Sequence, residues 1–140
     1  MPRVSAAREL LASRDDVWSF IADPHRFADW WPGVAAVEPD RRGFAEGARW
    51  VVHASGRPTV FRRSGYSGTL LVRAVERPRR FAWLLTGDRL DAELTLQPTD
   101  TDRTRAVLEV RAPWLVSLPR ALPRRALGRL HALCQTGAAL

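Results

Sequence analysis

Apolar and polar residues alternate with a period of two along much of the chain between residues 34 and 112. This period is typical of β-strands that have one buried face and one exposed face. It is sharpest in two neighbouring segments, whose apolar residues are Leu90, Ala92, Leu94 and Leu96 in the first and Ala106, Leu108, Val110 and Ala112 in the second. Since only one face is apolar, we expect an antiparallel sheet that covers another part of the protein on a single side.

Residues 4–12 and six further segments separated by turns are predicted to form the strands of this sheet. The clearest turns are residues 88–89 and 98–103. The six segments are 34–38, 48–54, 59–63 continuing through a glycine break into 66–76, 80–87, 90–97 and 104–112. Strands that follow one another without intervening helices favour one antiparallel sheet over β-α-β units.

Residues 13–34 carry the pattern of two short helices. Ser13 is a suitable N-cap for the first helix, because its hydroxyl can accept a hydrogen bond from a free backbone N–H. The residues predicted to share the buried face of this helix are Val17, Phe20 and Ile21. Pro24 ends the first helix and opens the second. The second helix is predicted to bury Phe27 and either Trp30 or Trp31.

The last long element is an amphipathic helix over residues 122–138. At 100° per residue, its apolar stripe contains Leu122, Ala126, Leu127, Leu130, Leu133, Cys134 and Gly137. The stripe is rich in small residues and lacks aromatic ones, so packing on the sheet is favoured over binding to a membrane surface. Together these elements predict a single α+β domain over residues 1–140.

The order of these elements resembles the START-like or SRPBCC superfamily, whose members have the helix-grip fold. The resemblance rests on Val17-Trp18, Ile21-Ala22-Asp23-Pro24, Trp30-Trp31-Pro32, Gly47 before Arg49-Trp50, residues 75–80 before Phe81-Ala82-Trp83, and residues 102–104 at the start of the last strand. It implies a curved antiparallel sheet of about six to seven strands wrapped around the long C-terminal helix, with two short helices after the first strand.

The resemblance also implies a cavity between sheet and helix that binds a hydrophobic small molecule such as a lipid or polyketide. Small residues such as Ala92, Ala106 and Ala126 leave room for it, whereas a core filled by the six tryptophans themselves is the alternative. The residues expected to line the cavity are Phe27, Trp31, Trp50, His53, Tyr66, Trp83, Leu94, Leu108, Leu130 and Cys134.

No catalytic motif can be identified in this sequence. His53 and Tyr66 are weak candidates for an acid/base pair, and Arg49, Arg62 or Arg73 would reach the cavity only if their strands bulge. We expect neither a metal site nor a cofactor. Three functions therefore stay open: a binder or carrier of a hydrophobic molecule, a cofactor-free polyketide cyclase/dehydrase-like enzyme, and a protein-interaction module of the chaperone-activator type.

The net charge of +7 would suit nucleic acid, but all 22 basic residues are arginines and no lysine or asparagine occurs. This bias is typical of GC-rich codon usage, so we predict a solvated surface and no nucleic-acid partner. The chain has neither an apolar signal sequence nor an 18-residue apolar span, and its single Cys134 forms no internal disulfide. A cytoplasmic monomer or homodimer without stable membrane insertion is expected.

Overall fold

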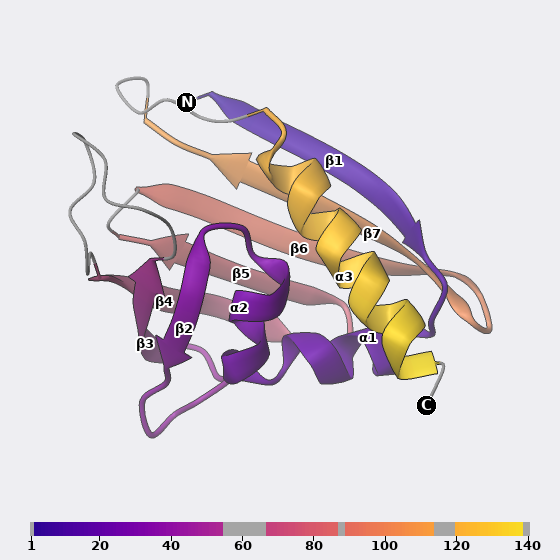
Figure 1. Ribbon diagram of the computed structural model, residues 1–140, viewed down its shortest axis with the longest axis horizontal. Coiled ribbons are helices and arrows are strands. Elements are labelled where there is room, and N and C mark those ends of the chain that lie inside the picture. Colours follow the sequence, from indigo (N-terminus) through magenta and orange to yellow (C-terminus); the bar gives the residue numbers. More distant parts are fainter. Residues whose placement is uncertain (1, 55–66, 87–88, 114–119, 139–140) are drawn as a thin grey trace.

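The computed structural model describes residues 2–54, 67–86, 89–113 and 120–138 (Figure 1). The strands in chain order are β1 (Arg3–Leu10), β2 (Val34–Glu38), β3 (Arg49–Ala54), β4 (Ser67–Glu76), β5 (Arg80–Leu85), β6 (Leu90–Asp100) and β7 (Arg103–Arg111). The helices are α1 (Arg14–Ile21), the short 3₁₀ helix η1 (Pro24–Arg26), α2 (Phe27–Trp30) and α3 (Leu122–Ala138).

The strands of the described residues form one antiparallel sheet in the order β1-β7-β6-β5-β4-β3-β2. Figure 1 shows that the sheet is curved and that α3 lies across one of its faces, which we call the inner face. The helix α3 packs on β1 and β7, and α2 packs between α3 and β2. This arrangement confirms the predicted α+β helix-grip fold.

Both α1 and η1 begin at polar caps, of which the sequence predicts the first. The Ser13 hydroxyl accepts a hydrogen bond from the backbone N–H of Asp16 at 3.2 Å, and Asp23 caps η1 in a similar way. The buried face of α1 differs from the prediction at two positions: Trp18 is buried, whereas Phe20 is only partly buried and lies beside the Arg26 guanidinium. Trp18 faces the core and packs edge to face on Phe44, which comes from the loop before β3. The helical period alone does not predict this contact, because Phe44 lies outside the helix.

The core lies between the inner face of the sheet and α3. The predicted alternation in β6 and β7 is confirmed, because all eight of the apolar residues assigned to the dry face are buried. In α3 the apolar stripe is buried at Ala126, Leu127, Leu130 and Cys134, while Leu122 and Leu133 are partly buried.

Several predicted boundaries differ from the observed ones. The first strand ends at Leu10 instead of residue 12, and β5 ends at Leu85 instead of residue 87. The strand β6 continues through Pro98 to Asp100, so the predicted turn over 98–103 shortens to the two residues that precede Arg103. Proline is tolerated there because the pairing with β7 is irregular between Pro98 and Asp100. The predicted strand 59–63 lies outside the described residues.

No helix of the described residues is long and apolar enough to cross a membrane.

Candidate functional site

Eight aromatic side chains gather in the interior, and we call them the aromatic cluster. They come from α1, α2 and the residue after it, the loop before β3, and the strands β3 and β5: Trp18, Phe27, Trp30, Trp31, Phe44, Trp50, Phe81 and Trp83. All are buried except Phe44, which is partly buried. The sequence predicts one of Trp30 and Trp31 in the core, and the structure buries both.

Phe27 contacts four indole rings of the cluster. It stacks on Trp31 at a centroid distance of 5.7 Å and meets Trp30, Trp50 and Trp83 edge to face at 5.1 to 6.1 Å. Trp83 in turn stacks on Phe81 at 4.6 Å. These are favourable arrangements for aromatic rings, so the rings hold one another in defined orientations. A ligand admitted between them has to separate some of these contacts.

The loop between β2 and β3 positions Trp50. The Asp40 carboxylate accepts hydrogen bonds from the backbone N–H groups of Arg42, Gly43 and Arg49 at 2.9 to 3.2 Å. These bonds, led by that from Arg49, lower the pKa of Asp40. The carbonyl of Gly43, held in this way, accepts a hydrogen bond from the Trp50 indole at 2.7 Å. Trp50 is thus buried with its polar atom satisfied.

The indole N–H groups of Trp30 and Trp83 are different. Both side chains are fully buried, and neither Nε1 atom has a hydrogen-bond acceptor among the described residues. Buried donors in folded proteins nearly always have an acceptor, so two in one cluster need an explanation. No sequence pattern foretells this feature, because it depends on which backbone carbonyls the folded chain brings close.

The described part of the interior is otherwise almost free of polar groups. Thr104 is the one buried polar or charged residue there, and its hydroxyl donates to the carbonyl of Ala12 at 2.8 Å. Leu94, Leu108, Leu130 and Cys134 are buried as predicted. Burial, with a smaller effect of Asp16, raises the pKa of the Cys134 thiol to about 11. The thiol is therefore protonated at neutral pH and acts as a small apolar group.

The weak catalytic candidates do not join the cluster in the described structure. In β3, Trp50 and Val52 are buried, so the side chain of His53 lies on the outer face of the sheet. It is 41% exposed, and its Nε2 atom lies 3.4 Å from a Glu38 carboxylate oxygen. Tyr66 and Arg62 lie outside the described residues. Arg49 is exposed, and Arg73 stays on the outer face although β4 has a pairing irregularity beside it.

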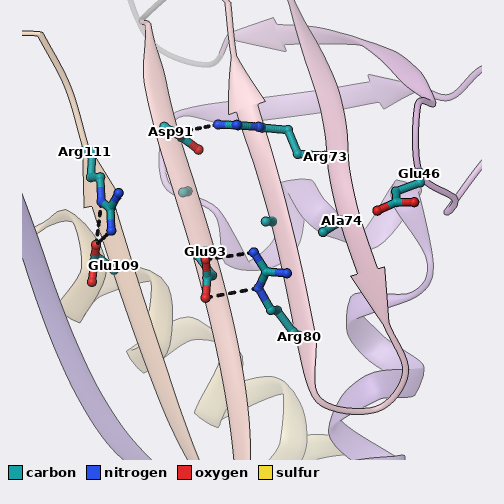
Figure 2. A pocket seen from close by; sticks show the side chains of 10 residues that line it. Glu46, Arg73, Ala74, Arg80, Asp91, Glu93, Glu109 and Arg111 are labelled. Carbon is teal, nitrogen blue, oxygen red and sulfur yellow. Dashed lines mark hydrogen bonds and ion pairs between the residues drawn. The ribbon is translucent and has the colours of Figure 1, made fainter.

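The outer face of the sheet carries a charged hollow of about 450 Å³ (Figure 2). Arg73 extends from β4 over β5 to Asp91 on β6, and the Arg80 guanidinium lies 3.1 Å from Glu93. The third pair, Arg111 with Glu109, lies on β7 at 2.6 Å. These guanidinium and carboxylate groups are partly exposed and paired with one another, so they add little stability and none of the three pairs needs a ligand.

No group of three His, Cys, Asp or Glu side chains in the described residues is arranged to hold a metal ion.

The helix-grip fold is the one that the resemblance to the START-like or SRPBCC superfamily predicts. The family described as "Polyketide cyclase / dehydrase and lipid transport" matches residues 1–135. The chain belongs to this family, which confirms the resemblance seen in the sequence. No curated protein sequence matches the chain significantly.

Solved structures share the fold at low sequence identity. The AHSA1-like protein from Aeromonas hydrophila is 16% identical, with a TM-score of 0.74 over 98% of this chain and 94% of that one. The protein XoxI from Bacillus cereus is 11% identical, with a TM-score of 0.73 over 99% of both chains. A point mutant of norcoclaurine synthase from Thalictrum flavum, bound to a transition-state analogue, is 15% identical, with a TM-score of 0.67 over 98% of this chain and 96% of that one.

Proposed function

We propose that this protein binds a hydrophobic small molecule between the inner face of its sheet and α3, and carries or sequesters it. The observation that carries the proposal is the pair of buried, unpartnered indole N–H groups of Trp30 and Trp83. A protein that needed these tryptophans only as packing would gain by replacing each with an apolar ring, since an unsatisfied buried donor costs about 1–3 kcal/mol. A ligand with an acceptor atom removes this cost.

The apolar walls of the aromatic cluster support the same proposal. Pockets for small molecules are lined mainly by hydrophobic and aromatic side chains with a few polar groups that orient the ligand. The described interior has this composition, and the family description includes lipid transport. The ligand-lining residues we propose are Phe27, Trp31, Trp50, Trp83, Leu94, Leu108, Leu130 and Cys134, with Trp30 added by the structure.

The described residues support a binder more strongly than an enzyme. General acid/base catalysis needs a titratable side chain within hydrogen-bond reach of the substrate. Among the described residues, the aromatic cluster contains no such group, and His53 lies on the other face of the sheet. The cyclase/dehydrase alternative would gain support if a bound polyketide left the protein with its mass changed.

Native mass spectrometry of the purified protein, compared with its denatured mass, tests the proposal. We expect an adduct that is lost on denaturation and that extraction identifies as a hydrophobic molecule. A clean apo mass, together with no uptake from a panel of fatty acids and aromatic ketones, would overturn the proposal. That result would favour the interaction module, with the charged outer face in Figure 2 as its first docking surface to test.

A further inference from the structure

A second pocket lies at the surface of the protein, apart from the interior site proposed above. It has a volume of about 490 Å³ and lies where the end of β1, the helix α1, the turn between β6 and β7 and the C-terminal half of α3 meet (Figure 1). We infer that this pocket, which we call the acidic pocket, binds a small organic cation: an amine that carries an apolar body. The inference is independent of the proposed function, because it concerns a different site and a different class of ligand.

Two carboxylates without a partner line the acidic pocket. Among the described residues, neither the Asp16 nor the Asp102 side chain forms an ion pair or a hydrogen bond, and no arginine or histidine lines the pocket. The chain has 22 arginines and a net charge of +7, and carboxylates elsewhere, such as Glu9, Asp91 and Glu93, pair with arginines. The pocket therefore presents a negative charge that the described part of the protein does not neutralise.

Serine hydroxyls complete the polar wall. The Ser13 hydroxyl accepts a hydrogen bond from the backbone N–H of Asp16 at 3.2 Å, and the Ser19 hydroxyl donates to the Asp16 carbonyl at 2.6 Å. The Ser19 oxygen therefore keeps its lone pairs for another donor. An ammonium group has three donors and no acceptor, so it can use the carboxylates of Asp16 and Asp102 together with a hydroxyl oxygen.

The other wall is apolar and exposed. Leu11, which is 45% exposed, is one of only two large hydrophobic side chains that are exposed among the described residues, and it lines the pocket. Phe20, expected in the core, is only partly buried and lines the pocket as well. The Arg26 guanidinium lies 5.3 Å from the centroid of this ring, an arrangement in which an aromatic ring attracts a cation. Covering this exposed area takes an apolar group, which an inorganic cation lacks.

Cys134 closes the inner end of the acidic pocket. Its side chain is 2% exposed, and its thiol forms no hydrogen bond among the described residues. Burial is the main cause that raises the pKa of this thiol and Asp16 is the second, so the Asp16 carboxylate lies close to the sulfur. The pocket thus has a buried, weakly polar end that a bound molecule can contact, and it is more than a groove between two solvated carboxylates.

Four probes test the inference by NMR titration of the unmodified protein at low salt. 2-Phenylethylamine has a cation and a ring, 2-phenylethanol lacks the charge, ethylamine lacks the ring, and phenylacetate reverses the charge. One exposed ion pair changes an affinity by up to about fivefold, so two carboxylates should make phenylethylamine bind about tenfold more tightly than phenylethanol. Ethylamine should bind about tenfold more weakly than phenylethylamine, because it covers less apolar area, and phenylacetate should bind most weakly.

The resonances that shift give the location of the bound amine. The backbone N–H resonances of residues 13–20 and of Asp102 should shift on titration with phenylethylamine. The indole N–H resonances of Trp30 and Trp83, which lie in the interior, should not shift. The affinity for phenylethylamine should also fall as salt is added, whereas that for phenylethanol should not.

Variants assign the preference to the residues of the pocket. Asp16→Asn and Asp102→Asn should each lower the affinity for phenylethylamine severalfold and leave that for phenylethanol nearly unchanged. Asp15→Asn is the matched control, because it removes the same charge from the same turn of α1 and does not line the pocket. Leu11→Ala should weaken both ring-bearing probes, whereas Val51→Ala, at the other exposed large hydrophobic residue, should weaken neither. The comparison of the probes on the unmodified protein stands even if a variant does not fold.

Three outcomes would overturn the inference: equal affinities for phenylethylamine and phenylethanol, equal effects of Asp15→Asn and Asp16→Asn, or no saturable binding of phenylethylamine. Shifts of the interior indole resonances in place of those of α1 would overturn it as well, because they would place the amine in the interior. The proposed function is tested separately by the native mass, so either can fail while the other stands.

Discussion

Thr104 shows how one residue can tie two distant parts of the chain together in a nearly apolar interior. It begins the pairing of β7 with β1, and its hydroxyl donates to the carbonyl of Ala12, just after β1. The bond is fully buried, so water cannot replace it. This buried polar residue is satisfied within the protein, in contrast to the indoles of Trp30 and Trp83.

The substitution Thr104→Val should therefore lower the free energy of unfolding by about 1–3 kcal/mol, because it leaves the Ala12 carbonyl buried without a donor. Urea denaturation measures the change. Thr95→Val is the matched control, since Thr95 lies on the outer face of β6 and should change stability by at most about 0.5 kcal/mol. Equal effects of the two substitutions would show that the hydrogen bond is not what matters at position 104.

Cys134 should react slowly with a thiol reagent in the native protein. Because the thiolate is the nucleophile and burial raises the pKa of this thiol to about 11, we expect the reaction with DTNB at pH 8 to be about a hundredfold slower than in urea. All of the signal comes from this residue, the single cysteine of the chain. The native rate should go on rising about tenfold per pH unit above pH 9, whereas a plateau near pH 9 would indicate reaction through an opened state.

Among the elements, the loop between β2 and β3 depends on one charged group. The Asp40 carboxylate holds three backbone N–H groups, and the same loop supplies the acceptor for Trp50. Gly47 in this loop has a φ of +83°, and a side chain there would meet the Arg42 guanidinium. The loop is thus fixed by hydrogen bonds and backbone conformation, without a hydrophobic period.

Asp40→Asn should destabilise the protein at pH 7, because an amide oxygen cannot accept all three of these bonds. The pKa of Asp40 is lowered in the folded state, so its contribution to stability is present above its unfolded value of 3.8 and is lost as the pH falls through the lower folded value. The difference in stability between the unmodified protein and Asp40→Asn should therefore shrink below about pH 4. Thermal unfolding between pH 3 and pH 7 measures it, with Asp102→Asn in the turn before β7 as the control. A difference that does not change with pH would contradict the assigned cause.

Elements with a clear period were predictable from the sequence, and the connections between them were less so. The alternation in β6 and β7 and the stripe of α3 gave the correct buried faces. The extension of β6 past Pro98 could not be foreseen, because proline signals a turn and only the local pairing with β7 makes it tolerable. In the site, Trp31, Trp50 and Trp83 were expected from the sequence, whereas Phe44 comes from a loop, where no period applies.

At the scale of the whole molecule, a ligand inside the core should change stability as well as local structure. Because the aromatic cluster joins α1, α2, β3 and β5, a molecule bound there contacts elements from both layers of the fold. A ligand that binds only the folded state raises the free energy of unfolding by mass action, whatever its exact position. A partner that docks on the outer face would leave the indoles of the interior undisturbed.

The hydrophobic molecule identified by extraction, supplied at about one hundred times its dissociation constant, should therefore raise the free energy of unfolding by about 2.7 kcal/mol, which corresponds to several degrees in Tm. The intrinsic tryptophan fluorescence should change at the same time, because the ligand has to separate rings that are in contact without it. Differential scanning calorimetry and emission spectra measure the two effects on one sample. In Trp83→Phe, the rise in Tm at the same ligand concentration should be smaller, since the substitution removes part of the proposed wall and so weakens binding. A rise in Tm without any change in fluorescence would place the ligand away from the aromatic cluster and contradict the proposed site.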